Sequence, residues 1–174
     1  MPEVIAPQGW FITFTTALPR PLSALHIMQL LTISALLGLA TLAFSQYTVI
    51  YDEFYDGNLN SLNSVACSTG DYGLITYGYN TFGQIPTYPM IGGAPQIQGW
   101  NSPSCGTCWN LTYTDPHGGS SSVTFTAINL SGDPGRYTIS FAGMDELTNG
   151  NALTLDGASI SATQLPESAC AITF

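Results

Sequence analysis

Two cysteines lie three residues apart in the segment GWNSPSCGTCW (99–109), which also holds Trp100 and Trp109. A Cys-x-x-Cys pair can form a dithiol redox centre, half of a four-cysteine zinc site, or the meeting point of two structural disulfides. The redox centre needs a helix N-terminus in a βαβ unit, and zinc normally needs a second close pair of cysteines. Disulfides need an oxidising compartment.

The surroundings of the pair favour disulfides. The other two cysteines, Cys67 and Cys170, stand alone in the sequence, unlike the two close pairs of a typical zinc site. A strand-like pattern begins at Trp109 and no βαβ unit is visible, so a thioredoxin-type centre is disfavoured. An even number of cysteines is typical of a disulfide frame in a secreted protein. Three pairings are possible, and the residues alone leave all three open.

The compartment is indicated by an uncharged, apolar run, IMQLLTISALLGLATLAF, at residues 27–44. Such a run is either a minimal membrane span or the apolar core of a secretory signal. Small residues, Ala43 and Ser45, precede Gln46 at the positions that a signal peptidase reads, and no basic cluster follows. We therefore predict cleavage before Gln46, with a retained membrane anchor as the alternative.

The chain accordingly divides into three parts. Residues 1–27 fit neither a signal nor a folded domain, and we interpret them as a mis-called or non-native extension. Residues 28–45 are the predicted signal peptide, and residues 46–174 form one domain of ordinary size. The predicted product is secreted, extracellular or bound to the cell wall, and has no membrane contact once it is processed.

Charge narrows the class of partner. The predicted domain has ten acids, no lysine and a single arginine, Arg136, and the net charge of the whole chain is −9. Binding to nucleic acid requires lysine and arginine to neutralise phosphates, so nucleic acid is excluded. Anionic membranes and acidic polysaccharides are disfavoured for the same reason. Neutral partners remain, and the nine tyrosines suit either an ordinary β core or stacking on sugar rings.

Patterns of apolar residues predict a mainly β domain, either a small barrel or an α+β domain with little helix. One helix is predicted over residues 138–150, where Asn149-Gly150 can end it, and a weaker one over residues 52–62. Residues 76–99 read as ordered loop with short strand pieces. Strands are expected at 47–51, 109–114, 122–129, 152–165 (two short strands about Asp156-Gly157) and 169–174.

The cysteine–tryptophan motif resembles that of the cerato-platanin family of small secreted fungal proteins. The similar segments are GWNSPSCGTCW, VIYD (49–52), SVACSTGDYGL (64–74), MDELTNG (144–150) and ESAC (167–170). The resemblance runs through nearly the whole predicted domain, and the eleven-residue motif is its most specific part. It implies a six-stranded double-psi β-barrel with one or two short helices, related to expansins and barwin. It also implies disulfides Cys67–Cys105 and Cys108–Cys170.

The resemblance also implies a function. Family members bind chitin oligomers, loosen cellulose without detectable hydrolysis, self-assemble at hydrophobic interfaces and are perceived by plants as elicitors. The expected protein is therefore a non-enzymatic, wall-associated binder of neutral polysaccharide such as chitin or cellulose oligomers, with self-assembly and a plant receptor as further partners. The alternatives are a weak glycoside hydrolase on the same barrel and a surface-active coat protein without sugar specificity.

The sequence departs from the family in the groove that crosses the barrel. Where the family ends a strand with an acid, this chain has Asn129, and a family Phe-Asn-Ile is replaced by Tyr137-Thr138-Ile139. Asparagine cannot transfer a proton, which argues against hydrolysis, but it can still hydrogen-bond a sugar. Asn110 and Asn129 both begin glycosylation sequons.

The expected binding residues come from these motifs. Asp52, Asp71 and Asp133 are the acids from which a hydrolase would need to draw a pair. Trp109 alternates with apolar residues and is expected in the core, whereas Trp100 is free to stack on a sugar. No metal site and no cofactor are expected. The candidate carbohydrate-binding residues are Tyr51, Asp52, Asp71, Trp100, Asn129, Asp133 and Thr138.

Overall fold

The computed structural model describes residues 46–174. The predicted extension at 1–27 and the predicted signal peptide at 28–45 lie outside the described residues. Among residues 46–174, none of the helices has the length and the apolar character that a membrane span requires.

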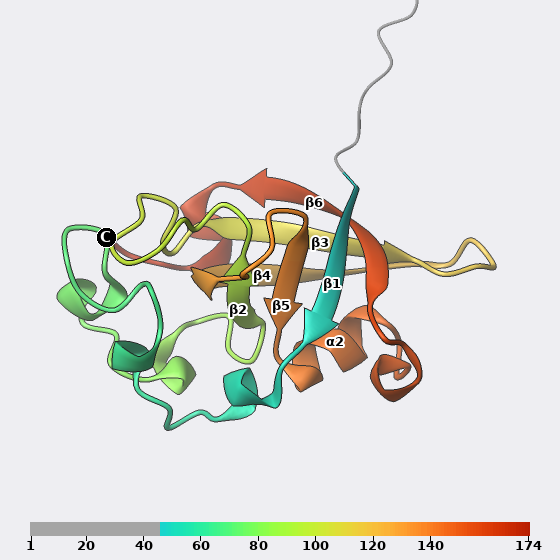
Figure 1. Ribbon diagram of the computed structural model, residues 1–174, viewed down its shortest axis with the longest axis horizontal. Helices are drawn as coiled ribbons and strands as arrows, with labels where there is room; N and C mark the ends of the chain where they lie inside the picture. The colour runs from blue at the N-terminus through green and yellow to red at the C-terminus, as the bar shows by residue number, and fades with distance from the viewer. Residues whose placement is uncertain (1–45) are drawn as a thin grey trace, which may run out of the picture. The chain divides into compact units, whose positions relative to one another are not determined.

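Six strands close into one mixed barrel in the order β1-β5-β2-β4-β3-β6, with β6 returning to β1 (Figure 1). The pairs β1–β5 and β2–β4 are parallel, and the other four pairs are antiparallel. This confirms the predicted six-stranded barrel. The strands are β1 (Gln46–Tyr51), β2 (Ile91–Ala94), β3 (Cys108–Thr114), β4 (Ser120–Leu130), β5 (Arg136–Ile139) and β6 (Ala158–Leu165).

The interior of the barrel is filled by the apolar residues that alternate along its strands. Trp109 and Leu111 of β3 and Phe125 of β4 are buried, as their alternation predicts. Tyr137 of β5 is completely buried and packs edge-on against the rings of Trp109, Phe125 and Tyr47. Trp109 is therefore a core residue, as expected.

Two of the strand predictions are wrong. Residues 152–165 contain one strand, β6, because Ala152–Thr154 form a 3-10 turn and Gly157 takes a positive φ of 110° just before the strand begins. Residues 169–174 form no strand, since the 3-10 turn Glu167–Cys170 is followed by Ala171 in the left-handed region. The chain turns there, and Phe174 is half exposed.

The helix is shorter than predicted. Helix α2 spans Phe141–Leu147, because the first residues of the predicted range belong to β5, a strand that the sequence pattern did not reveal. Ser140 caps the helix, its Oγ accepting from the N–H of Gly143 at 2.8 Å. Asn149 and Gly150 follow with positive φ, so the predicted helix end is confirmed.

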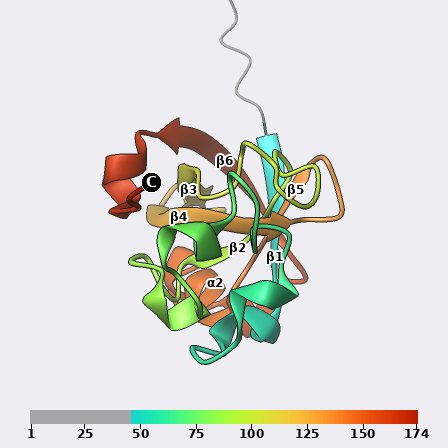
Figure 2. The ribbon, with the colours of Figure 1, turned by 90° about the vertical axis from the view of Figure 1, so that its left-hand side faces the viewer.

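Residues 53–85 form a segment that we call the loop layer. It contains four 3-10 turns, which gather on one side of β4 in Figure 2: Glu53–Asp56, Leu62–Ser64, Leu74–Tyr77 and Phe82–Gln84. The first of these turns stands where the weaker helix was predicted. Apolar side chains fix the layer, since Leu62, Leu74 and Phe82 are completely buried. The carboxylate of Asp56 adds a polar tie, because it accepts from the N–H groups of Phe141 and Ala142 at 2.7 and 3.0 Å.

All four cysteines are paired. Cys67 bonds to Cys105 and Cys108 bonds to Cys170, across sequence separations of 38 and 62 residues. The pairing implied by the family resemblance is thus confirmed. The Cys-Gly-Thr-Cys motif ties the loop layer and the C-terminal turn to the start of β3, which makes it a structural knot.

Candidate functional site

A register shift brings Asn129 to the outer face of the barrel. Simple alternation along β4 would place Asn129 on the inner face with Phe125 and Ala127. The ladder between β2 and β4 shifts instead, so that Gly92 pairs with Ala127 and Gly93 pairs with Asn129, which skips one residue of β4. Such bulges re-aim the side chains that follow them.

Asn129 and Thr138 lie in one row across the sheet. Gly93 pairs with Asn129 on one side and with Thr138 on the other, and Thr138 also pairs with Ile50 of β1. Strands are about 4.8 Å apart, so Asn129 and Thr138 are roughly 10 Å apart with a glycine between them. That glycine is buried, and a Cβ there would lie 2.7 Å from the carbonyl oxygen of Leu130. The position between Asn129 and Thr138 is therefore occupied by backbone and carries no side chain.

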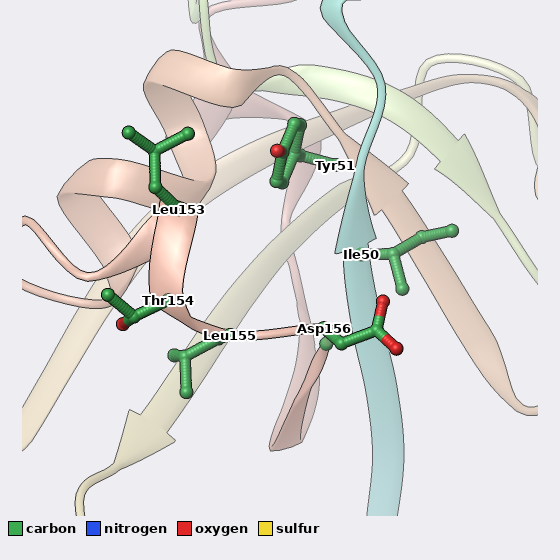
Figure 3. Close-up of a pocket in the computed structure, with 7 residues that line it drawn as sticks. Ile50, Tyr51, Leu153, Thr154, Leu155 and Asp156 are labelled. Carbon is green, nitrogen blue, oxygen red and sulfur yellow. The ribbon is translucent and has the colours of Figure 1, made fainter.

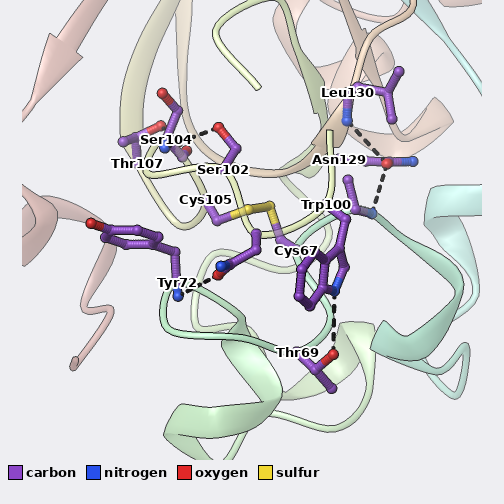
Figure 4. Close-up of a disulfide and its surroundings, with 12 residues drawn as sticks. Cys67, Thr69, Tyr72, Trp100, Ser102, Ser104, Cys105, Thr107, Asn129 and Leu130 are labelled. Carbon is purple, nitrogen blue, oxygen red and sulfur yellow. Dashed lines mark hydrogen bonds between the residues drawn. A yellow bond between two sulfur atoms is a disulfide. The ribbon is translucent and has the colours of Figure 1, made fainter. Parts of the chain in front are cut away.

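The side chain of Asn129 joins β4 to the loop layer. Its Oδ1 accepts from the N–H groups of Ala66 and Leu130, both at 3.0 Å, and its Nδ2 donates to the hydroxyl of Tyr55 at 3.0 Å. Figure 4 shows the amide of Asn129 hydrogen-bonded to Leu130 on one side and to the loop layer on the other. Burial raises the pKa of Tyr55, although the bond from Asn129 acts in the opposite direction. Asn129 thus has a structural role, and its contact with a ligand stays a prediction.

We expect Asn129→Ala to lower the free energy of unfolding by about 1–2 kcal/mol, because it leaves the partly buried N–H of Ala66 without its acceptor. Tyr55→Phe removes one hydrogen bond and should cost about 1 kcal/mol. Urea denaturation measures both values. Asn110→Ala is the control, since Asn110 on β3 hydrogen-bonds its neighbour Thr112, and the change there should stay within about 0.5 kcal/mol. Equal stability of the two alanine variants would contradict the role of Asn129.

Trp100 presents its ring to solvent while its nitrogen is held. The side chain is 64% exposed, and Nε1 donates to the hydroxyl of Thr69 at 3.3 Å (Figure 4). The next residue, Asn101, donates its N–H to the carbonyl of Ala66, whose own N–H binds Asn129. Ala66 therefore links the tryptophan loop to Asn129, and the indole is fixed at the edge of the loop layer.

A cavity of about 230 Å³ lies beside this region. It opens between the segment 95–98 and the segment 130–134 that leads from β4 toward β5, and its polar walls include Gln98 and Asp133. Asp133 also accepts from the N–H of Gly135 at 2.9 Å and lies 3.7 Å from the guanidinium of Arg136. We call the exposed indole of Trp100, the side chain of Leu130 and this cavity the Trp100 surface.

The other candidate binding residues lie elsewhere. Tyr51 lines a separate cavity of about 500 Å³ with Ile50 and the segment 153–157 (Figure 3). Ile50 is three strand spacings from Asn129, about 14 Å along the sheet. The structure therefore brings Trp100, Asn129 and Asp133 to one side of the molecule, and it places Tyr51 in a different recess.

The three acids weighed for hydrolysis come from different segments. Asp52 caps a 3-10 turn by accepting from the N–H of Phe54 at 2.9 Å, and Asp133 holds the turn before β5. Asp71 lies in the loop layer, where its carbonyl oxygen accepts from the hydroxyl of Tyr77. Neither of the two cavities is lined by more than one of these acids. Among residues 46–174, no group of three His, Cys, Asp or Glu side chains is placed to hold a metal ion.

The two glycosylation candidates differ in setting. Asn110 lies on β3 opposite Thr124 and Thr163, with its Nδ2 donating to Thr112 at 3.1 Å. The Nδ2 of Asn129 is the atom that donates to Tyr55. Occupancy of either sequon stays a prediction.

Comparison with known proteins gives a consistent result. The family described as Cerato-platanin matches residues 47–172. A heat-stable 19 kDa antigen of Coccidioides immitis is 39% identical over 133 residues, covering 76% of this chain and 86% of the antigen. The crystal structure of cerato-platanin 2 from M. perniciosa is 39% identical, with a TM-score of 0.68, and covers 73% of this chain and 99% of that one. The solution structure of the fungal elicitor Cerato-Platanin is 32% identical, with a TM-score of 0.57, covering 71% and 95%.

Proposed function

The chain belongs to the cerato-platanin family, and we propose that it is a secreted protein that binds neutral polysaccharide chains without cleaving them. The substrate class is chitin or N-acetylglucosamine oligomers, with cellulose-type glucan as the related polymer that the protein loosens. Two disulfides within residues 46–174 are consistent with secretion, because such bridges persist in oxidising compartments.

The exposed indole of Trp100 carries the proposal. An aromatic ring presents an apolar face on which the C–H face of a pyranose can pack, and a fixed ring loses little conformational freedom on binding. The bond to Thr69 and the hydrogen bond from the N–H of Asn101 to the carbonyl of Ala66 hold this ring in place. Gln98 and Ser131 in the adjacent cavity supply neutral hydrogen-bonding groups for hydroxyl or N-acetyl groups.

Charge supports a neutral ligand. Residues 46–174 have a single arginine, and that arginine lies beside Asp133 at the Trp100 surface. A polyanion would meet ten acids and no unpaired cation among the described residues. A neutral polysaccharide avoids that repulsion.

We expect Trp100→Ala to weaken binding of chitin hexamer about tenfold, equivalent to roughly 1.4 kcal/mol, because stacking area is lost. Trp100→Phe should retain most of the affinity. Isothermal titration measures the dissociation constant without relying on tryptophan fluorescence. Tyr72→Ala is the matched control, because Tyr72 is also an exposed aromatic residue but points away from Trp100 in Figure 4. Unchanged binding by Trp100→Ala would refute the assignment of this surface.

The absence of cleavage is part of the proposal. The dispersed positions of Asp52, Asp71 and Asp133 and the amide of Asn129 favour binding over proton transfer. The names of the relatives support a function without cleavage, since one is called an antigen and another an elicitor. Incubation of the purified protein with chitin or cellulose should release no reducing sugar above a boiled control. Release that disappears in Asp133→Asn would favour the hydrolase.

Recognition by a plant host is a further part of the proposal. It is supported by the similarity to Cerato-Platanin, which is described as a fungal elicitor. Infiltration of leaf tissue with the folded protein should trigger a defence response, and reduced, unfolded protein at the same concentration should not. A response of equal strength to both forms would mean that no folded surface is recognised.

A surface-active coat protein is the second candidate, and one observation favours it. Leu59 is 83% and Leu153 is 79% exposed, and each offers apolar surface that would leave water at an air–water or wall surface. The variant Leu59→Ser with Leu153→Ser should reduce surface activity in a pendant-drop measurement while leaving chitin binding unchanged. Loss of both properties together would show that one surface serves both.

A further inference from the structure

A third cavity lies apart from the Trp100 surface. Its volume is about 260 Å³, and its walls are Tyr72, Tyr77, Pro103, Cys105, Glu167 and Phe174. None of these residues lines either of the other two cavities. The three aromatic residues are each between about a third and a half exposed, so each keeps surface that a ligand can contact. We call this recess the tyrosine cavity.

The rings of the tyrosine cavity are held in position. The ring of Phe174 packs edge-on against Tyr77, with centroids 4.9 Å apart, and the hydroxyl of Tyr77 donates to the carbonyl of Asp71 at 2.8 Å. Gly106 makes room for Phe174, because a Cβ at this position would clash with the ring of Phe174. The N–H of Tyr72 donates to Asn101 Oδ1 at 2.9 Å.

Both disulfides brace the same recess. Cys105 is a wall of the cavity and is bonded to Cys67 of the loop layer. Glu167 begins the short turn that ends at Cys170, which is bonded to Cys108. The walls therefore come from separate parts of the chain that covalent bonds hold together, and a preorganised recess loses little freedom when a ligand binds.

Glu167 gives the recess a negative charge without a partner. The described residues contain one ion pair, Arg136 with Asp133, and it is at the Trp100 surface. Residues 46–174 have no lysine that could neutralise Glu167. A carboxylate beside three aromatic rings is the environment that attracts a cation, because the face of each ring is electron-rich.

We propose that the tyrosine cavity binds an organic ammonium group. Aromatic rings and one carboxylate are the groups that recognise quaternary and primary ammonium ions. The small volume suits a head group more than a whole drug-sized molecule, whose pockets are larger than about 300 Å³. Two sources offer this chemistry: a choline-type trimethylammonium head, and the free amine of a deacetylated amino sugar.

The test is a titration of the ¹⁵N-labelled protein followed by amide chemical shifts at constant ionic strength. Choline chloride and glucosamine hydrochloride are the two ammonium probes, and N-acetylglucosamine is the neutral match for glucosamine. The expected result is a saturable shift at Cys105, Gly106 and Thr173 for at least one ammonium probe, with a dissociation constant in the millimolar range. The probe that binds more tightly identifies the source.

Variants of the walls make the test specific. Tyr72→Ala and Glu167→Gln should each weaken binding of the ammonium probe by at least about fivefold. Phe174→Leu should weaken binding as much, although it keeps an apolar side chain at that position. Trp100→Ala should bind the ammonium probe normally, which separates this proposal from the polysaccharide site.

Three outcomes would overturn the proposal: N-acetylglucosamine binding in this cavity as tightly as glucosamine, shifts confined to other surfaces, or full affinity in both Tyr72→Ala and Glu167→Gln. Failure of this site leaves the chitin titration of the Trp100 variants unaffected. Failure of chitin binding likewise leaves this site testable.

Discussion

Replacing Cys108 and Cys170 together by alanine is expected to lower the free energy of unfolding by about 4 kcal/mol. The bridge spans 62 residues, and the unfolded chain gains that much conformational freedom when the bridge is absent. The variant Cys67→Ala with Cys105→Ala should lose slightly less, because its separation is 38 residues. A small domain has a total stability of roughly 5–15 kcal/mol, so a protein that lacks both bridges should be far less stable than either double variant.

Urea denaturation under non-reducing conditions measures these differences, and peptide mapping of the native protein checks the pairing. The two double variants serve as controls for each other, because each leaves the other loop closed. A loss below about 1 kcal/mol in both would mean that packing alone holds the loop layer. A map that joins Cys105 to Cys108 would contradict the pairing itself.

Replacing Tyr137 by alanine is the second change with a large expected effect, a loss of about 3–5 kcal/mol. The ring is completely buried and contacts Tyr47, Trp109 and Phe125, so its removal leaves a cavity in the centre of the barrel. The control Tyr137→Phe keeps the ring and loses the hydroxyl bond to Gln96 at 3.2 Å, which should cost about 1 kcal/mol. Equal losses in the two variants would show that the ring does not support the core.

Tyr137 should also make the stability of the protein depend on pH in the alkaline range. Burial raises the pKa of Tyr137 well above its usual range, although the bond to Gln96 acts in the opposite direction. Because the pKa of Tyr137 is higher in the folded state, its neutral hydroxyl contributes its full stabilisation below the unfolded pKa, which is about 10. That stabilisation is lost as the pH rises above this value. The free energy of unfolding should therefore fall as the pH rises above about 10, and the free energy of unfolding of Tyr137→Phe should fall less steeply over the same range. An identical slope for both proteins would contradict this.

The sequence alone determined the chemistry of the cysteines and the class of fold. The isolated positions of Cys67 and Cys170 argued against zinc and redox roles, and the strands that became β3 and β4 were visible because every second residue is apolar. The pairing of the cysteines and the closed barrel came from the resemblance to the cerato-platanin family. Patterns failed where a segment is short, as with the four-residue strand β5, or where one residue such as Ala171 turns the chain.

The arrangement of the candidate site was decided by the tertiary structure. Asn129 reaches the outer face because the ladder shifts between Gly92 and Gly93, and its partner Tyr55 is 74 residues away in the sequence. Nothing in the sequence indicates that Thr69 holds Trp100, because the two residues are 31 positions apart in the chain. Alternation along a strand reports which face is apolar, but a bulge reverses the faces beyond it, and a hydrogen bond between distant segments depends on how the whole chain folds. Residue types therefore specified what each side chain can do, while packing of the loop layer on the barrel decided which of them meet.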